Sequence, residues 1–531
     1  MSRKSRVGRS VFRVLRFPLL AGLLCVLVSA SLLGANPKYG GTLVFSFHDP
    51  ALLNPILQLD FRQVVSLVFD GLIGFDLDGN VVPALAESWS VSDDGLTYTF
   101  QLRKDVKWSD GTGFTAADVA FTYNAIKDPS VKSAYASQFA SLAAVTADGP
   151  YTVSFVLSTP SAPFLGKLWL GILPKHIWEG QDFATSKYNS SPIGTGPWKV
   201  EEWVQLDHIT FVANETYYRG RPYLDRLVMK VIPDATVAFA AIERGDIDYI
   251  AFTGIVGGVP YEQVDRLKTN PNLVVTLYSV PQPQELWFRV NEPPFDNVLV
   301  RQAVAHAIDR DYIVEKLLYG YGTVENSHVP SPIGWAYDPY VRGYAYDPKA
   351  ADALLDQAGY AKGTDGIRFK TTIYGTPGAR EVLCQVLKEN LRAVGIDATI
   401  DISDWTTYMN KVRVERTAHG MWSILAIPAL PEPDEGTIYV DSAEIKSGGR
   451  NASQYRNARI DELIALGRKE TDPGLRRAIY FEYQQILGEE LPCLTLYNVT
   501  AVDLWSSKFE GFYCTQWGGG SVTSLWRVWQ K

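Results

Sequence analysis

The sequence predicts an α/β protein built from at least two lobes, and two observations support this prediction. Its 531 residues are too many for one ordinary core, because single cores stop growing at about 250 to 300 residues. From Gly40 onward, short strand patterns alternate with helical patterns, which is typical of α/β or mixed layers. With 46% hydrophobic and 20% charged residues, the composition argues against disorder and against an integral membrane fold.

The first 35 residues have the composition of an export signal. Six Lys and Arg side chains occur without an acidic residue, an apolar run follows over 17–34, and small residues stand at Ala30 and Ala35. We expect residues 1–35 to be removed and the rest of the chain to lie in the periplasm or outside the cell. An uncleaved membrane anchor is the alternative, because an apolar run of 18 residues could nearly span a bilayer. Lipid attachment at Cys25 is not expected, because a leucine precedes it.

The charge of the mature chain excludes one class of partner. Without the signal, 44 Lys and Arg stand against 58 Asp and Glu, which gives a net charge of −14. This sign repels nucleic acids and anionic surfaces. We therefore expect no nucleic-acid partner.

The cysteines and histidines give little support for metal chemistry. Three cysteines remain after the signal, Cys384, Cys493 and Cys514, so at most one disulfide can form, and Cys493 with Cys514 is the favoured candidate pair. The sequence contains no CxxC motif or Cys/His cluster, and its six histidines are scattered. We expect no metal site and no cofactor.

Local patterns predict several elements. Residues 96–102 place apolar side chains at every second position, which predicts a half-buried strand. A turn at 109–111 leads to Thr115 and Asp118, which have the spacing of a helix N-cap and its N3 partner.

Two further helices and two hinge candidates follow in the second half of the sequence. Leucines at helical spacing over 383–394 form one apolar face, and Gly395 ends that helix. Asp472 and Pro473 predict the start of another helix, with Gly488 near its end. The proline-rich stretches 281–283 and 428–433 are candidate hinges or loops.

About a dozen short motifs then follow one another over nearly the whole mature chain. They include GGTLV at 40–44, LNP at 53–55, FDGL at 69–72, PALAESW at 83–89, GLTYTFQLR at 95–103, VKWSDG at 106–111, FTAADV at 114–119, PIGTGPW at 192–198, GDID at 245–248, VRQAV at 300–304 and LLDQAGY at 354–360. Each motif alone is best explained by structure. In this order they resemble the extracytoplasmic solute-binding proteins of the oligopeptide, dipeptide and nickel type of ABC importer.

The resemblance implies a two-lobed periplasmic-binding-protein (Venus flytrap) fold with an additional inserted lobe and a discontinuous first lobe. The implied segments are 36–70, 171–283 and 491–531 for the first lobe, 71–170 for the inserted lobe and 284–490 for the third lobe. The ligand is implied to lie between the first and third lobes. A monomeric chain would capture a small solute there, a peptide or alternatively an oligosaccharide, and deliver it to a membrane permease.

Three aromatic side chains are candidates for contact with the ligand. Tyr135 matches a tyrosine that reaches the ligand from the inserted lobe of oligopeptide-binding relatives, and Trp405 matches a pocket tryptophan of the third lobe. Tyr497 is the third candidate, where the chain returns toward the first lobe. The alternative for each of them is a packed core aromatic.

The loop at 429–434 bears on the identity of the ligand. Peptide-binding members carry an aspartate that pairs with the ligand's free amino group, and Ala429 stands at that position. Either Glu432 or Asp434 substitutes for it, or the ligand has no free amino group, because an unpaired buried ammonium costs several kcal/mol.

An enzyme and a purely structural envelope protein are the remaining alternatives. A secreted hydrolase would use the crowded carboxylates at 432–435 as a glycosidase pair, but carboxylates this close in sequence usually form a solvated loop. The sequence has no GxSxG, no HExxH and no phosphate-binding glycine loop. We expect no catalytic activity.

Overall fold

The computed structural model describes residues 37–58, 62–251, 259–425, 430–515, 517 and 520–531. The expected export signal at 1–35 and Ala429 lie outside the described residues. Within these ranges, no helix combines the length and the apolar character that crossing a bilayer requires.

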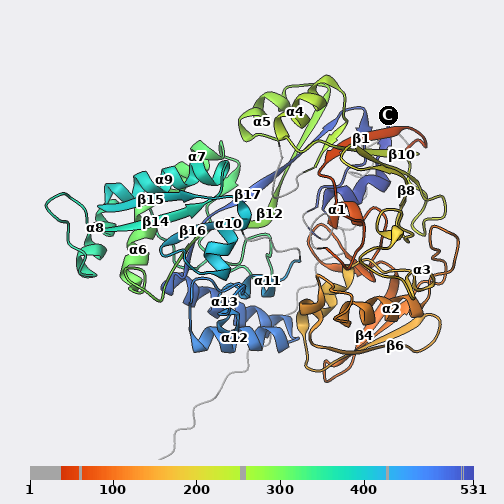
Figure 1. The fold of residues 1–531 in the computed structure, drawn as a ribbon, viewed down its shortest axis with the longest axis horizontal. Coiled ribbons are helices and arrows are strands. Elements are labelled where there is room, and N and C mark those ends of the chain that lie inside the picture. The colour runs from red at the N-terminus through yellow and green to blue at the C-terminus, as the bar shows by residue number, and fades with distance from the viewer. Residues whose placement is uncertain (1–36, 59–61, 252–258, 426–429, 516, 518–519) are drawn as a thin grey trace, which may run out of the picture.

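Two bodies lie side by side and share two long strands (Figure 1). The first body holds helices α1–α5 and strands β1–β11, and the second body holds helices α6–α13 and strands β13–β16. One sheet of eleven strands runs through both bodies in the order β15-β14-β16-β12-β17-β11-β1-β10-β9-β8, and β13 pairs with β17. The predicted mixed α/β architecture is confirmed.

The strands fall into one large sheet and three smaller ones. The large sheet contains β1 (Thr42–Phe47), β8 (Trp198–Val204), β9 (His208–Ala213), β10 (Arg226–Val231), β11 (Tyr249–Ile250), β12 (Leu273–Phe288), β13 (Gly322–Thr323), β14 (Phe369–Gly375), β15 (Ile396–Ile402), β16 (Met421–Leu425) and β17 (Cys493–Ser506). The smaller sheets are β4 (Ala86–Val91), β5 (Thr97–Leu102), β7 (Thr152–Leu157) and β6 (Leu142–Ala147), then β2 (Ile73–Phe75) with β3 (Val81–Pro83), and β18 (Phe509–Glu510) with β19 (Trp529–Gln530).

The helices cover the faces of these sheets. In chain order they are α1 (Arg62–Val65), α2 (Ala116–Lys127), α3 (Lys175–Trp178), α4 (Ala235–Arg244), α5 (Tyr261–Lys268), α6 (Val298–Ala307), α7 (Arg310–Leu317), α8 (Pro348–Gln357), α9 (Ala379–Ala393), α10 (Trp405–Met409), α11 (Asp434–Thr437), α12 (Ala458–Lys469) and α13 (Pro473–Glu490). Short 3₁₀ helices include η1 (Ala136–Phe139), η2 (Ala162–Trp169) and η6 (Ser521–Arg527).

The local predictions for the strand and the capped helix are confirmed. Strand β5 covers the alternating segment, and its buried residues are the apolar ones. Thr115 is the N-cap of α2, and its backbone N–H donates to the Asp118 carboxylate at 2.9 Å in a capping box.

The two predicted helices of the second body are also confirmed. Helix α9 buries Leu383, Leu387 and Leu391, and Gly395 follows it with φ 84°, a backbone angle that glycine adopts without strain. Helix α13 begins at the Asp472 N-cap, whose carboxylate accepts from the backbone N–H of Leu475 at 2.8 Å.

The paired strands β12 and β17 connect the two bodies, and their ladder is interrupted midway. Residues 273–279 of β12 pair with 500–506 of β17, but the register then shifts before Pro283 pairs with Asn498. In the gap, the backbone N–H of Gln282 donates to the side-chain oxygen of Asn498 at 2.9 Å and not to a backbone carbonyl of the neighbouring strand. The proline-rich stretch 281–283 therefore lies where the ladder passes from one body to the other, as a hinge requires.

The cores follow these bodies. The largest hydrophobic cluster combines residues of the expected inserted lobe, such as Tyr123 and Phe155, with Phe45 and Trp198 of the large sheet. Two further clusters fill the second body. The four-stranded sheet and α2 lie within 71–170, and the exact lobe boundaries stay a prediction.

The candidate disulfide between Cys493 and Cys514 does not form, because Cys384, Cys493 and Cys514 are all free thiols. Cys493 lies in a core cluster of the second body, whereas Cys514 packs against the core of the first body. The two sulfur atoms therefore belong to different bodies.

Asp70 is a buried carboxylate in the first body and makes stability dependent on pH. Burial raises the pKa of Asp70 from 3.8 to about 6, although the Arg219 charge and the Tyr217 hydroxyl oppose this shift. The Tyr217 hydroxyl donates to Oδ1 at 3.4 Å, and Oδ2 has no hydrogen-bond partner among the described residues. At pH values between 3.8 and about 6, Asp70 is therefore protonated in the folded state and ionised in the unfolded chain.

Stability is expected to fall as pH rises from about 4 to about 6, by at most about 3 kcal/mol from this group. The Asp70→Asn variant keeps the shape of the side chain and loses the titration. We expect it to unfold at a higher temperature than the wild type at pH 7.5 and at nearly the same temperature at pH 4. Calorimetry at both pH values measures this difference, and a difference that does not change with pH would contradict the assignment.

Candidate functional site

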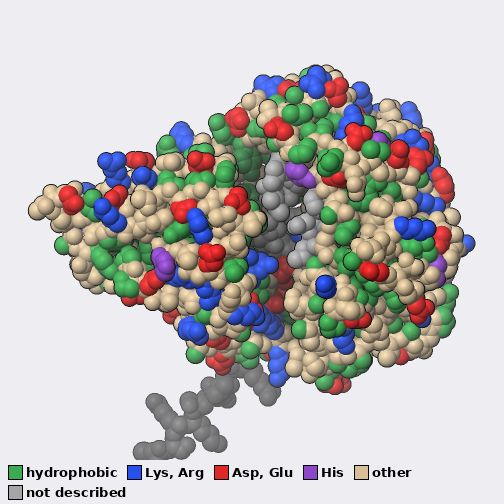
Figure 2. Space-filling model, viewed as in Figure 1, with side chains coloured by type: hydrophobic (Ala, Val, Ile, Leu, Met, Phe, Trp, Pro, Cys, Tyr) green, Lys and Arg blue, Asp and Glu red, His purple; other side chains and the backbone are tan. Residues whose placement is uncertain are grey.

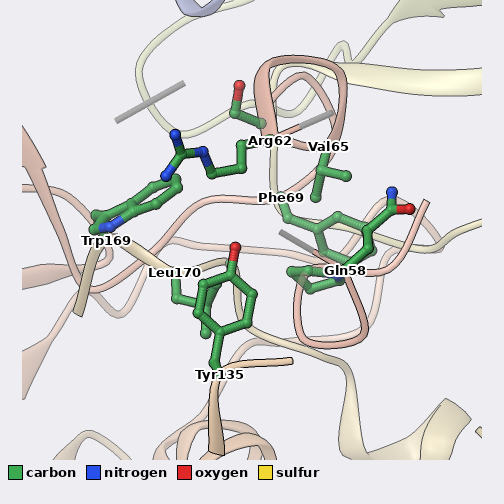
Figure 3. A pocket seen from close by; sticks show the side chains of 10 residues that line it. Gln58, Arg62, Val65, Phe69, Tyr135, Trp169 and Leu170 are labelled. Atoms are coloured by element: carbon green, nitrogen blue, oxygen red, sulfur yellow. The ribbon is translucent and has the colours of Figure 1, made fainter. Parts of the chain in front are cut away.

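A pocket in the first body opens between α1 and the end of η2 (Figure 3). Its cavity volume is about 30 Å³, which is the room of about one water molecule. It is lined by Pro55, Gln58, Arg62, Val65, Ser66, Phe69, Tyr135, Trp169, Leu170 and Gly171. The Arg62 guanidinium lies over the Trp169 ring, with 5.8 Å between its central carbon and the ring centroid. The pocket thus combines a positive charge with aromatic walls.

The predicted ligand residue Tyr135 lies in this pocket. The Ser133 hydroxyl donates to the Ile56 carbonyl at 2.7 Å and so holds the segment before Tyr135 beside Ile56. The Tyr135 side chain is buried, and its hydroxyl points toward the space between Trp169 and Phe69 (Figure 3). Its position suits a pocket wall, and its contact with a ligand stays a prediction.

Figure 2 shows a depression between the two bodies, with Lys and Arg side chains gathered near its lower end. A second pocket also lies between the two bodies. Its walls are Val91, Ser92, Asp93, Gly95, Tyr98, Ala162 and Leu165 from the first body and Trp335, Thr471, Pro473 and Arg476 from the second body. Its empty volume is about 1080 Å³, which includes open solvent. A groove between two lobes is a common form of ligand site.

Glu432 and Asp434 are both paired with arginines of the second body. Arg476 donates to both carboxylate oxygens of Glu432, at 2.6 and 3.0 Å, and its cation lies over the Trp335 ring. Arg468 donates to Asp434 at 2.6 Å. Burial raises the pKa of Glu432, and the Arg476 hydrogen bonds and charge oppose that rise. Each carboxylate thus has a cationic partner without any ligand.

Trp405 and Tyr497 occupy different environments. Trp405 is 52% exposed at the start of α10, with the Arg380 guanidinium 5.4 Å from its ring centroid. The core alternative is therefore wrong for Trp405, and its contact with a ligand stays a prediction. Tyr497 is buried in a core cluster of the second body, and burial raises its pKa. Its position is that of a packed core aromatic.

Sequence reasoning missed Arg62, Trp169, Trp335 and Arg476. Each becomes a candidate only through its neighbour in space, and the two members of each cation–aromatic pair are more than a hundred residues apart in sequence. Composition gives no signal for such pairs, because most aromatic residues in a chain of this size are core residues.

Comparisons with known proteins cover nearly the whole chain. The family described as bacterial extracellular solute-binding proteins, family 5 Middle, matches residues 80–447. The oligopeptide-binding protein AppA of Bacillus subtilis is 33% identical over 512 residues, which is 91% of each chain.

Two solved structures show the same arrangement of lobes. NikZ from Campylobacter jejuni, in complex with Ni(L-His), has a TM-score of 0.80 and 28% identity over 92% of this chain and 99% of its own. The binding protein DppA from Helicobacter pylori, in complex with the peptide STSA, has a TM-score of 0.78 and 28% identity over 93% of this chain and 98% of its own. The expected two-lobed binding-protein fold is confirmed.

Proposed function

The chain belongs to the bacterial extracellular solute-binding proteins of family 5, and from this membership we propose that it captures a small peptide outside the cytoplasm. It delivers the peptide to the membrane permease of an ABC importer and acts as a monomer. The family resemblance stated from the sequence is confirmed. The observation that carries the proposal is the family match over 80–447 in a chain whose two bodies share an interrupted pair of strands.

The interrupted strands support capture by closure. A break in the ladder at 280–282 lets the bodies move while both strands stay continuous. Closure buries ligand surface that the open form exposes, so one protein can both hold and release a solute.

The chemistry of the pocket supports a peptide-like ligand. AppA is named as an oligopeptide-binding protein, and the structure of DppA contains a bound peptide. Neither protein supports the oligosaccharide alternative. Arg62 supplies a positive charge for a carboxylate, and Tyr135 and Trp169 supply aromatic faces for side chains. No bond is broken in this function, so we expect no turnover.

The free amino group of the peptide is expected to contribute little to binding. Ala429 offers no carboxylate, and Glu432 and Asp434 are already held by arginines. N-acetylation of a bound peptide should therefore change the dissociation constant by less than about threefold. Isothermal titration with matched free and acetylated short peptides measures this ratio.

Three results would contradict parts of the proposal. A loss of about 100-fold on acetylation would show that a carboxylate does pair with the ammonium. Hydrolysis of the peptides would support the enzyme alternative. Saturating peptide without a decrease in the radius of gyration by X-ray scattering would exclude capture by closure.

A further inference from the structure

Three side chains that can bind a metal meet in the core of the second body, although the sequence predicts no metal site. Glu285 lies near the end of β12, Cys493 begins β17, and His328 follows β13. All three are buried, with at most 6% of their surface exposed. Their ligand atoms lie within 4.8 Å of one another.

The distances between these atoms suit a metal ion. His328 Nδ1 lies 2.6 Å from Glu285 Oε1, and Cys493 Sγ lies 3.9 Å from both of them. The centre of the circle through the three atoms is about 2.1 Å from each, close to the zinc distances of about 2.0–2.2 Å for nitrogen and oxygen and about 2.3 Å for sulfur. Ligation of a tetrahedral Zn²⁺ would also require His328 Nδ1 and Glu285 Oε1 to move apart to about 3.3 Å, together with a small outward movement of the sulfur.

A second layer of contacts orients two of the three ligands. His328 Nε2 donates to the Gly436 carbonyl at 2.9 Å, which directs Nδ1 to the cluster. Trp287 Nε1 donates to Glu285 Oε2 at 3.1 Å, which leaves Oε1 for the cluster. In metal sites, a backbone carbonyl commonly holds the second nitrogen of a ligating histidine, and ligating carboxylates are hydrogen-bonded in the same way.

Tyr483 lies in the same core cluster as Cys493. Its side chain is 1% exposed, and its hydroxyl has no hydrogen-bond partner among the described residues. Its ring centroid lies 6.3 Å from that of His328, in the same core cluster as Cys493. Burial raises the pKa of Tyr483, and the charges of Cys493 and Glu285 add to that rise. A buried hydroxyl without a partner is costly, which marks this core cluster as one whose polar groups are incompletely paired.

We propose that Glu285 Oε1, His328 Nδ1 and Cys493 Sγ bind one divalent transition-metal ion of the Zn²⁺ type. Mixed nitrogen, oxygen and sulfur ligands favour Zn²⁺ over Mg²⁺ or Ca²⁺. Binding releases two protons, one shared between Nδ1 and Oε1 and one from the thiol. The cluster, with its metal, thiolate and carboxylate, then has no net charge.

A metal ion in this site would connect the loop that contains Glu432 to β12 and β17, the two strands that the bodies share. Gly436, which holds His328, lies in α11, and Glu432 precedes that helix by two residues. A Cβ on Gly436 would lie 3.2 Å from His328 Nε2, so the helix approaches the histidine closely. A bound metal would therefore fix the position of α11 relative to β12 and β17.

Reconstitution with Co²⁺ tests the site, because thiolate ligation to Co²⁺ gives a charge-transfer absorption band. The mature chain is unfolded with a chelator and refolded with Co²⁺ or Zn²⁺, since the buried site needs unfolding for full exchange. We expect one Co²⁺ per chain, the thiolate band, release of two protons, and a higher unfolding temperature with Zn²⁺.

Cys493→Ser and Cys384→Ser form a matched pair, because both cysteines are buried in the second body and only Cys493 lies in the cluster. Cys384→Ser should keep the band, and Cys493→Ser should lose it and bind at least about 100-fold more weakly. A band that persists in Cys493→Ser overturns the proposal. If Cys493→Ser does not fold, the test is Co²⁺ binding by the refolded wild-type protein. A refolded wild-type protein that binds no Co²⁺ overturns the proposal. Peptide binding is not a readout, so this test is independent of the proposed function.

Discussion

The Arg476→Met variant is expected to lose about 3–5 kcal/mol of unfolding free energy, because it leaves a buried carboxylate without its partner. Arg476 is 7% exposed, makes a two-point ion pair with Glu432 and donates to the Gly467 carbonyl at 2.9 Å. Methionine fills much of the same volume, so the loss comes from the charge and hydrogen bonds and not from a cavity. Denaturant unfolding of the unliganded protein measures the change.

The neighbouring Arg477 is a matched control. It is exposed on the same helix and contacts the Phe481 ring, so Arg477→Met should cost less than about 0.5 kcal/mol. Equal stability of the two variants would show that the Glu432 pair contributes nothing.

The pH dependence of Arg476→Met identifies the unpaired group. Burial already raises the pKa of Glu432, and loss of the cation should raise it further. A carboxyl whose folded pKa is raised destabilises the fold increasingly as pH rises through the range between its unfolded and folded pKa values. The unfolding free energy lost in Arg476→Met should therefore become smaller as the pH falls toward 5. Adding Glu432→Gln to this variant should recover part of the lost free energy at pH 7.5.

Local structure was predictable from the sequence wherever a short pattern has one physical solution. The alternation at 96–102 and the Thr115–Asp118 cap each depend on neighbours within a few residues, and both are confirmed. The order of the motifs along the chain also predicted the family, because that order follows the elements of the whole fold.

Residues that matter through long-range contacts were not predictable in this way. Glu285, His328 and Cys493 are 43, 165 and 208 positions apart pairwise, so no spacing rule connects them. The same limit produced the wrong disulfide, since the sequence does not show that Cys493 and Cys514 belong to different bodies. Among the aromatic candidates, exposure separated Trp405 from Tyr497, the third candidate, although both were expected to contact the ligand.

The Trp405→Ala variant is expected to weaken peptide binding by tenfold or more while leaving the unliganded fold nearly intact. Trp405 is half-exposed, so its truncation creates no core cavity, and the lost Arg380 contact is worth at most about 1 kcal/mol at such a site. Trp198→Ala is the contrasting variant, because Trp198 is 1% exposed and its loss should cost about 3–5 kcal/mol. Titration with the tightest peptide and denaturant unfolding of both variants separate the two effects. Unchanged affinity in Trp405→Ala, or an unliganded protein as unstable as Trp198→Ala, would remove Trp405 from the ligand site.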